Sequence, residues 1–182
     1  MVYINLVSVE PENTEHQKFL YEIIKYRWNN HEIVNLTYRT DSTVPTFEEH
    51  KEALFSKRYK HHYIIRLGEV DIGSCYIDRE DTYGMFILPS YLKQALKTYG
   101  KKNTELDTRP EPISVVAFKR MIALHPEITL FYATANPKNT LSRTVMVKGG
   151  HKEVEVILTQ KTKDGKLVGG AWPDAYDDEE SV

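Results

Sequence analysis

Side chains that can exchange protons are scattered along the chain and do not form a familiar catalytic order. The tyrosines and histidines of interest below are Tyr83, Tyr132, His50 and His125. No Ser/His/Asp order, Walker-type loop or metal-ligand cluster stands out. The single cysteine, Cys75, excludes an internal disulfide framework and zinc binding by a cysteine cluster. What these side chains can do therefore depends on the elements that carry them.

The stretch from residue 132 to 151 is the most informative of these elements. Residues 128–134 are dense in β-branched and aromatic side chains, which predicts a buried central strand. Pro137 stops the strand, and a helix is expected to begin near Asn139. Two glycines at 149–150 are expected to end that helix, because glycine readily takes positive φ. The pattern predicts a strand, a short helix and another strand.

This unit resembles the C-terminal half of the GNAT acyltransferases, the Gcn5-related acetyl-CoA-dependent family. The residues that carry the resemblance are Asn139, Ser142, Lys148 and Gly150, with His151 where the family usually has phenylalanine. The resemblance implies transfer of an acyl group, most simply acetyl from acetyl-CoA (coenzyme A), to a primary amine. The acceptor could be an amino sugar, a protein N-terminus or a small metabolite.

The predicted order of elements also resembles that of the GNAT family. Capping boxes at Thr14/Gln17 and Thr46/Glu49 predict the starts of two helices, the first reaching about Trp28. The expected elements are a strand at 2–9, these two helices, strands at 63–67, 70–77 and 83–88, a helix at 115–125, the strand–helix unit, and a strand at 153–162. The implied fold is α/β: one GNAT-like domain with a mixed, mostly antiparallel central sheet flanked by helices.

The C-terminal region contains one turn and an acidic end. Asp164-Gly165 predicts a tight turn into a weaker strand near residues 167–172. We expect the domain to span residues 1–173 and the acidic residues 174–182 to be disordered.

The N-terminal helix end resembles the sugar and ribosomal-protein subgroups of the family. The matching residues are Arg27, Trp28, Asn29, Asn30, His31, Phe47 and His50. The resemblance implies that Trp28, His31 and His50 contact the acceptor. An amphipathic helix with a polar end is the alternative interpretation.

In GNAT enzymes the coenzyme A pyrophosphate binds backbone amides of a loop that opens a helix, where the helix N-terminus favours an anion. Two registers are open here, residues 92–97 and residues 109–114, and the second matches better because Arg109 comes first and Ser114 last. It makes residues 90–108 an insertion, with a helix expected at 90–100. The resemblance also implies a splay between the strands 83–88 and 128–134, where an open strand edge pairs with the amides of the pantetheine arm. The implied cofactor contacts are Phe86, Ile87, Leu88, Arg109, Glu111, Ile113, Ser114, Asn139 and Ser142.

Two residues depart from the family pattern. Pro112 replaces the central glycine of the phosphate loop and has no amide N–H. Met146 stands where many members have a tyrosine as general acid, and methionine cannot donate a proton. The amine still needs a base, and the candidates by position are Tyr83, Tyr132 and His125.

The composition of the chain limits the classes of ligand and partner that it can bind. The chain has 182 residues and a net charge of −2, but five acids lie in residues 174–182. The remainder holds 24 bases against 21 acids, a charge of about +3 that suits a phosphorylated ligand. With no long apolar run and one cysteine, we expect a cytoplasmic protein without a membrane segment or metal, and a homodimer is compatible with the sequence. A GNAT-shaped binding protein and a nucleic-acid-modifying enzyme remain alternatives.

Overall fold

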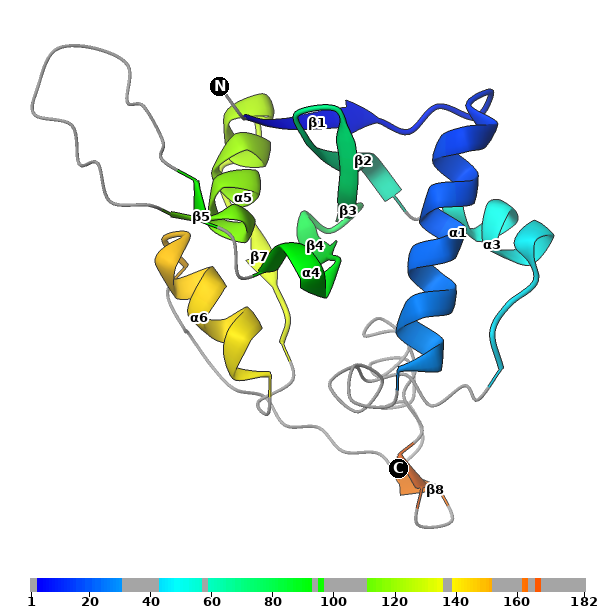
Figure 1. The fold of residues 1–182 in the computed structure, drawn as a ribbon. Coiled ribbons are helices and arrows are strands. Elements are labelled where there is room, and N and C mark those ends of the chain that lie inside the picture. The colour runs from blue at the N-terminus through cyan, green and yellow to red at the C-terminus, as the bar shows by residue number, and fades with distance from the viewer. Residues whose placement is uncertain are drawn as a thin grey trace, which may run out of the picture.

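A five-stranded sheet organises the protein in the computed structural model (Figure 1). The structure describes residues 3–30, 43–56, 59–92, 95–96, 111–135, 139–151, 162–163 and 166–167. The strand order is β1-β2-β3-β4-β7, and every neighbouring pair is antiparallel except β4 and β7, which run parallel. The expected α/β fold with a mixed, mostly antiparallel sheet is therefore confirmed.

The helices and strands follow the order that the sequence predicts, with additional short elements. They are β1 (Ile4–Ser8), α1 (Thr14–Asn29), α3 (Phe47–Leu54), β2 (Tyr59–Leu67), β3 (Val70–Asp78), β4 (Thr82–Ile87), α4 (Pro89–Leu92), β5 (Ala95–Leu96), β6 (Glu111–Pro112), α5 (Ile113–Leu124), β7 (Tyr132–Ala133), α6 (Thr140–Lys148), β8 (Thr162–Lys163) and β9 (Lys166–Leu167).

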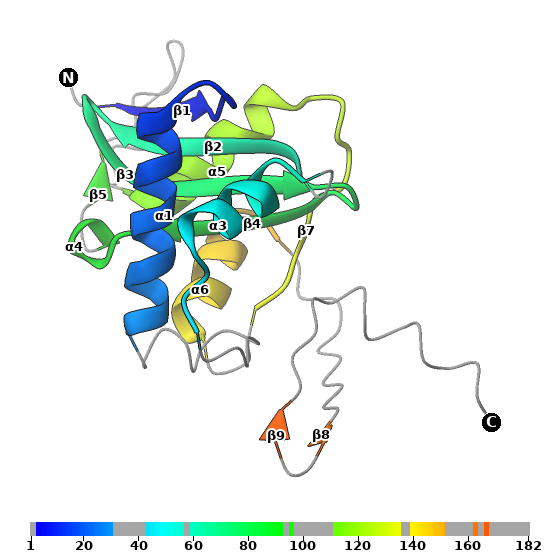
Figure 2. The same ribbon diagram turned by 90° about the vertical axis from the view of Figure 1, so that its right-hand side faces the viewer.

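Helices cover both faces of the sheet. Helices α1 and α3 lie on one face, and α5 and α6 lie on the other (Figure 2). Because side chains alternate along a strand, the adjacent residues Ile64 and Ile65 of β2 are both fully buried, one under each layer. The larger core packs against α5, whose Phe118 and Met121 are almost inaccessible to solvent. Burial of each such side chain contributes about 2–3 kcal/mol.

Local signals decide several helix ends. The capping box at Thr46 and Glu49 is present, as predicted. Helix α1 begins at Thr14, but its cap is Asn13, whose Oδ1 accepts from the His16 N–H at 3.1 Å. The predicted Thr14/Gln17 box is wrong because the Gln17 amide instead donates to the Pro11 carbonyl at 2.5 Å. At the end of α6, Gly150 has φ of +99°, as expected for a glycine stop.

Three predicted elements have different lengths. The helix expected at 90–100 is wrong, since α4 ends at Leu92 and β5 pairs with β6. Strand β2 already begins at Tyr59, four residues before the predicted start at residue 63. The predicted buried central strand at 128–134 is reduced to Tyr132–Ala133 at the sheet edge, where Tyr132 is 54% exposed.

The remaining features concern the C-terminal part and the surface. The short strands β8 and β9 pair antiparallel on either side of the predicted turn, while most of the strand expected at 153–162 lies outside the described residues.

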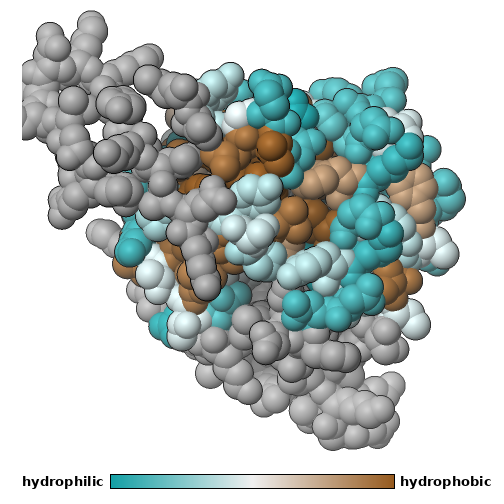
Figure 3. All heavy atoms as spheres, in the orientation of Figure 1, coloured by the Kyte–Doolittle hydropathy of each residue, from teal (hydrophilic) through white to brown (hydrophobic). Residues whose placement is uncertain are grey.

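Apolar residues gather over α5 on the face seen in Figure 1, whereas α1 presents mostly hydrophilic side chains there (Figure 3). Within the described part of the chain, no helix has the length and apolarity needed to span a membrane.

Candidate functional site

The carboxyl-terminal half of β4 has a free backbone edge. Strand β7 pairs with β4 only at Thr82 and Tyr83. The Leu88 N–H donates to the Ile72 carbonyl of β3, whereas the Asp81 carbonyl accepts from the Tyr132 N–H on the β7 side. By alternation, the N–H and C=O groups of residues 85 and 87 face the β7 side. No described strand pairs with them there, so this edge can bind an extended ligand backbone.

A cavity lies beside this edge, on the face covered by α1. Its volume is about 470 Å³. It is lined by Phe19, Glu22, Ile23, Lys25, Tyr26, Asn29, Asn30 and Leu88. Phe86 belongs to the same face, where the Arg27 guanidinium lies 5.3 Å from its ring centre. The cavity is therefore walled by the second half of α1 and by the end of β4.

A row of aromatic residues crosses the sheet on the same face. His62, Tyr76 and Gly84 lie opposite one another on β2, β3 and β4. A Cβ on Gly84 would lie 2.2 Å from the Tyr76 ring, so only glycine lets the ring lie over β4. His62 is 5.9 Å from Tyr76 between ring centres, and Tyr59 also packs against Tyr76. The row leads from the interior of the face to the open edge.

His62 is the most unusual group in that row. Both of its ring nitrogens are buried and have no hydrogen-bond partner among the described residues. Burial lowers its pKa to about 4, with a smaller contribution from the nearby His50. The imidazole is thus neutral near pH 7 and can accept a hydrogen bond. A buried polar group without a partner calls for an explanation, and a catalytic role or a bound water is one.

Comparison with solved structures decides the fold family. The protein is similar to RimL, a ribosomal L7/L12 α-N-protein acetyltransferase in complex with coenzyme A, with a TM-score of 0.63, 13% identity, and coverage of 90% of this chain and 88% of that chain. It is also similar to a domain from Methanocaldococcus jannaschii (TM-score 0.58, 16% identity, 92% and 96% covered). A third similar structure is AAC(6')-Ib in complex with paromomycin and acetyl-CoA (TM-score 0.52, 16% identity, 81% of each chain covered). The chain has the GNAT fold. No protein-family model and no curated protein matches the sequence.

Two of the three predicted catalytic residues, Tyr83 and Tyr132, differ in exposure: Tyr83 is buried and Tyr132 is exposed. Tyr83 is 5% exposed, faces the α5 core and packs 4.6 Å from Phe118 between ring centres. Among the described residues, its hydroxyl donates only to the Met85 sulfur, at 3.8 Å, and burial raises its pKa. Tyr132 lies on the exposed β7. The structure therefore does not bring these two hydroxyls together.

His125, the third predicted catalytic residue, lies at the other end of α5 from the predicted phosphate loop. It caps the helix C-terminus and is buried. Its Nε2 is 2.7 Å from the Tyr63 hydroxyl, and its Nδ1 is 2.8 Å from a Glu127 carboxylate oxygen. The helix has 12 residues, a length of about 18 Å at 1.5 Å per residue. His125 thus belongs to a separate cluster.

The predicted phosphate loop is built differently from the expectation. Glu111 and Pro112 form β6, and the Glu111 carboxylate pairs with Lys119. The side chains of Ile113 and Ser114 are buried, so neither faces an open surface. Among the described residues, no side-chain capping hydrogen bond forms at the N-cap of α5, which is Pro112. The backbone amides of its first turn therefore remain as the anion-binding groups here, and Arg109 lies outside the described residues.

The other predicted contacts are spread over several elements. Asn139 caps α6, with its Oδ1 accepting from the Ser142 N–H at 3.0 Å. The Ile87 side chain is buried in the α5-side core, whereas those of Phe86 and Leu88 face α1. Of the predicted acceptor residues, Trp28 and His50 lie on α1 and α3, and His31 lies outside the described residues.

Sequence reasoning missed His62, Tyr76 and the role of Gly84. A glycine inside a strand is a signal of close approach by another group, and Gly84 carries that signal. The pairing of His62 with Tyr76 depends on strand register, for which the sequence offers no local marker.

Proposed function

We propose that the chain is an acetyl-CoA-dependent N-acetyltransferase that acts on a primary amine. The observation that carries the proposal is the free edge of β4 next to the α1 cavity. The edge suits the amide-bearing pantetheine arm of coenzyme A, and the cavity suits a small acceptor. RimL and AAC(6')-Ib, which share the fold, are named as an α-N-protein acetyltransferase and an aminoglycoside acetyltransferase.

The groups proposed to hold coenzyme A are mostly backbone groups. Met85 and Ile87 present N–H and C=O groups at the edge, which refines the expectation for residues 86–88. The first turn of α5, where no described side chain makes a capping hydrogen bond, would attract the pyrophosphate, with Arg109 supplying charge. The bound cofactor would supply an activated thioester with a thiolate leaving group. Asn139 and Ser142 would contribute through the position of α6, since their polar groups bond to each other.

The acceptor is proposed to enter through the α1 cavity. Asn29 and Asn30 provide amides there, and Glu22 pairs with Lys25 at 2.5 Å, so the cavity carries balanced charge. Trp28 and His50 are retained as acceptor contacts. We further propose that the neutral His62 imidazole, which does not line the cavity but lies in the aromatic row on the same face, accepts a hydrogen bond from the amine. Its low pKa makes it a positioning group more than a strong base.

A catalytically inactive binding protein of the same fold is the second candidate. Pro112, at the cap of α5, removes one amide from the anion site. Met146 cannot protonate a thiolate. Both departures weaken the case for catalytic activity but leave the cavity unchanged.

Calorimetry with coenzyme A and an acetyl-transfer assay on aminoglycosides and on peptide N-termini test the proposal. Met85→Pro removes an N–H that faces the open edge, and we expect it to weaken coenzyme A binding by about 1–1.5 kcal/mol, the value of one hydrogen bond. Leu6→Pro is the matched control. Because the Val9 N–H donates to His62, the Leu6 N–H faces outward on the opposite edge, in strand β1.

The two variants should lose comparable stability, while only Met85→Pro should lose affinity. If the wild-type protein fails to bind at millimolar coenzyme A, the enzyme proposal is wrong and the binding-protein candidate replaces it. Binding without transfer to any amine of the panel would also favour that candidate.

A further inference from the structure

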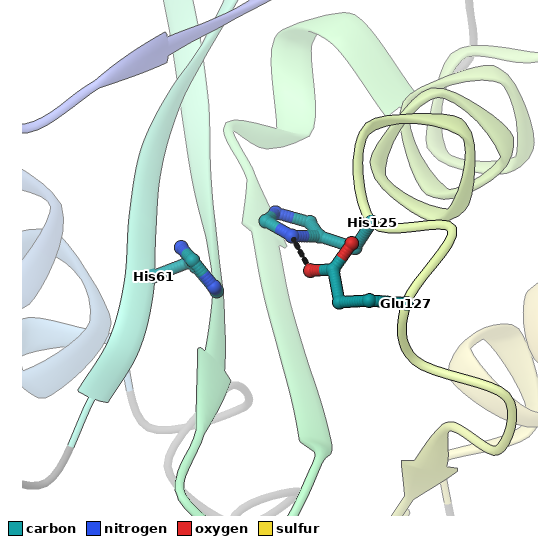
Figure 4. Close-up of side chains that lie close together, drawn as sticks. All are labelled: His61, His125 and Glu127. Atoms are coloured by element: carbon teal, nitrogen blue, oxygen red, sulfur yellow. Dashed lines mark hydrogen bonds and ion pairs between the residues drawn. The ribbon is translucent and has the colours of Figure 1, made fainter.

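Three side chains that the proposed transferase site does not use converge at the far end of α5. His61 comes from β2, while His125 and Glu127 follow α5 in the sequence (Figure 4). Their ligand atoms all lie within 4.8 Å of one another. The His61 and His125 rings are 4.0 Å apart between centres. Two imidazoles and one carboxylate form a donor set that suits zinc.

We propose that His61, His125 and Glu127 form a binding site for a divalent transition-metal ion, with Zn²⁺ as the ion that fits best. Water would complete the coordination, as in zinc sites with three protein ligands. The proposal is independent of the transferase function, because it uses other residues and another part of the fold.

The hydrogen bonds around His125 select the nitrogen that would bind the metal. Its Nε2 lies 2.7 Å from the Tyr63 hydroxyl, whereas its Nδ1 faces Glu127. With zinc on Nδ1, the ring proton sits on Nε2 and donates to the Tyr63 oxygen. A metal-bound histidine almost always donates its second nitrogen in this way, which fixes the orientation of the ring.

The required adjustments are small and fall on accessible side chains. Zinc bonds of about 2.0–2.2 Å place ligand atoms about 3.3–3.6 Å apart in a tetrahedron. The 2.8 Å contact from His125 Nδ1 to Glu127 must therefore open slightly, and any wider separation, up to the limit of 4.8 Å, must close. The Glu127 side chain is 61% exposed and His61 is only partly buried, so both can rotate. His125, which is buried, can stay in place.

The surrounding charges permit a cation. Lys60 neighbours His61 on β2, but its ammonium pairs with the Asp81 carboxylate at 2.6 Å. Glu127 contributes a negative charge directly to the site. Its exposure also offers an entry path from solvent.

The test is titration of metal-free, untagged full-length protein with Zn²⁺ in a calorimeter, together with Co²⁺ absorption spectroscopy. We expect one equivalent of Zn²⁺ to bind and Co²⁺ to give the visible bands of a four-coordinate site. His61→Asn and Glu127→Gln should each weaken Zn²⁺ binding at least about tenfold, since even outer partners of metal ligands contribute 10–100-fold. Glu80→Gln, at an exposed acid on the β3–β4 turn, is the matched control and should bind as the wild type does.

Circular dichroism of the metal-free variants shows that any loss of binding is not a loss of folding. His125 is left unchanged because its buried bonds support the fold. The proposal is overturned if the wild-type protein does not bind one equivalent, or if His61→Asn or Glu127→Gln binds as tightly as Glu80→Gln.

Discussion

The two ends of β4 carry two different kinds of candidate site. At the carboxyl end, backbone groups of residues 85 and 87 face an open edge beside the α1 cavity. Near the amino end, Tyr83 lies opposite Ile77 of β3, and Ile77 lies opposite His61 of β2. There, side chains from β2 and from the residues after α5 converge. The first site follows from how strands diverge, whereas the second depends on three particular side chains. A backbone site tolerates changes in side chains as long as the strand path is kept.

The largest effect should come from disturbing that strand path. A Cβ at Gly73 would lie 2.3 Å from the Phe86 carbonyl oxygen, a backbone atom of β4. Gly73→Ala should therefore cost about 3 kcal/mol of unfolding free energy and displace the open edge. Denaturation in urea measures this cost, and calorimetry follows the loss of coenzyme A binding.

Gly84→Ala is the matched comparison, because its Cβ would meet only the end of the Tyr76 ring, which can rotate. We expect about 1 kcal/mol for it. Equal costs for the two variants would mean that the close approach of β3 and β4 is not what holds the open edge.

Arg109→Ala should act on the carboxyl-end site alone. If Arg109 opens the phosphate loop, its removal weakens coenzyme A binding by about 1–3 kcal/mol, the scale of a charge-assisted contact. Lys93→Ala and Lys97→Ala, from the other register, should change the affinity little. Isothermal titration of all three variants decides the register, and the opposite ranking would place the phosphate loop at residues 92–97.

Tyr63→Phe should act on the amino-end site alone. It removes the hydroxyl 2.7 Å from His125 Nε2 and leaves a buried nitrogen without its partner, so we expect a loss of about 1–2 kcal/mol of stability. Tyr83→Phe is the matched control on the same face, since within the described residues its hydroxyl makes only the weak contact to a sulfur. Chemical denaturation gives both values.

Acetyl transfer by the same two variants tests whether either tyrosine takes part in catalysis. Tyr63→Phe and Tyr83→Phe should both leave acetyl transfer intact. A large loss of turnover in Tyr83→Phe at unchanged stability would restore Tyr83 as a catalytic residue.

The smallest effect is expected from shortening the predicted insertion. Replacement of residues 97–108 by a short Gly/Ser linker removes none of the described contacts, so the unfolding free energy should change by less than about 0.5 kcal/mol. Leu92→Ala, which truncates a side chain packed on the α5-side core, should cost more. A loss of cooperative thermal unfolding in the linker variant would mean that these residues are part of the domain core.

Local chemistry in the sequence determined much of the framework. The Thr46 cap and the Gly150 stop were predictable because each depends on hydrogen bonds or φ values within a few residues. The order of elements followed from hydrophobic periodicity, and with it the resemblance to the GNAT fold. The open edge near residues 83–88 was implied by that resemblance.

Tertiary structure alone decided the rest. The amphipathic pattern at 90–100 favoured a helix, but pairing of β5 with β6 outweighed that local preference. The row of His62 and Tyr76 depends on strand register, and the cluster of His61, His125 and Glu127 joins positions more than 60 residues apart. Periodicity states which face a side chain occupies, but not which distant side chain lies opposite it. That choice is made by the packing of α5 against the sheet, since only the folded chain sets both positions at once.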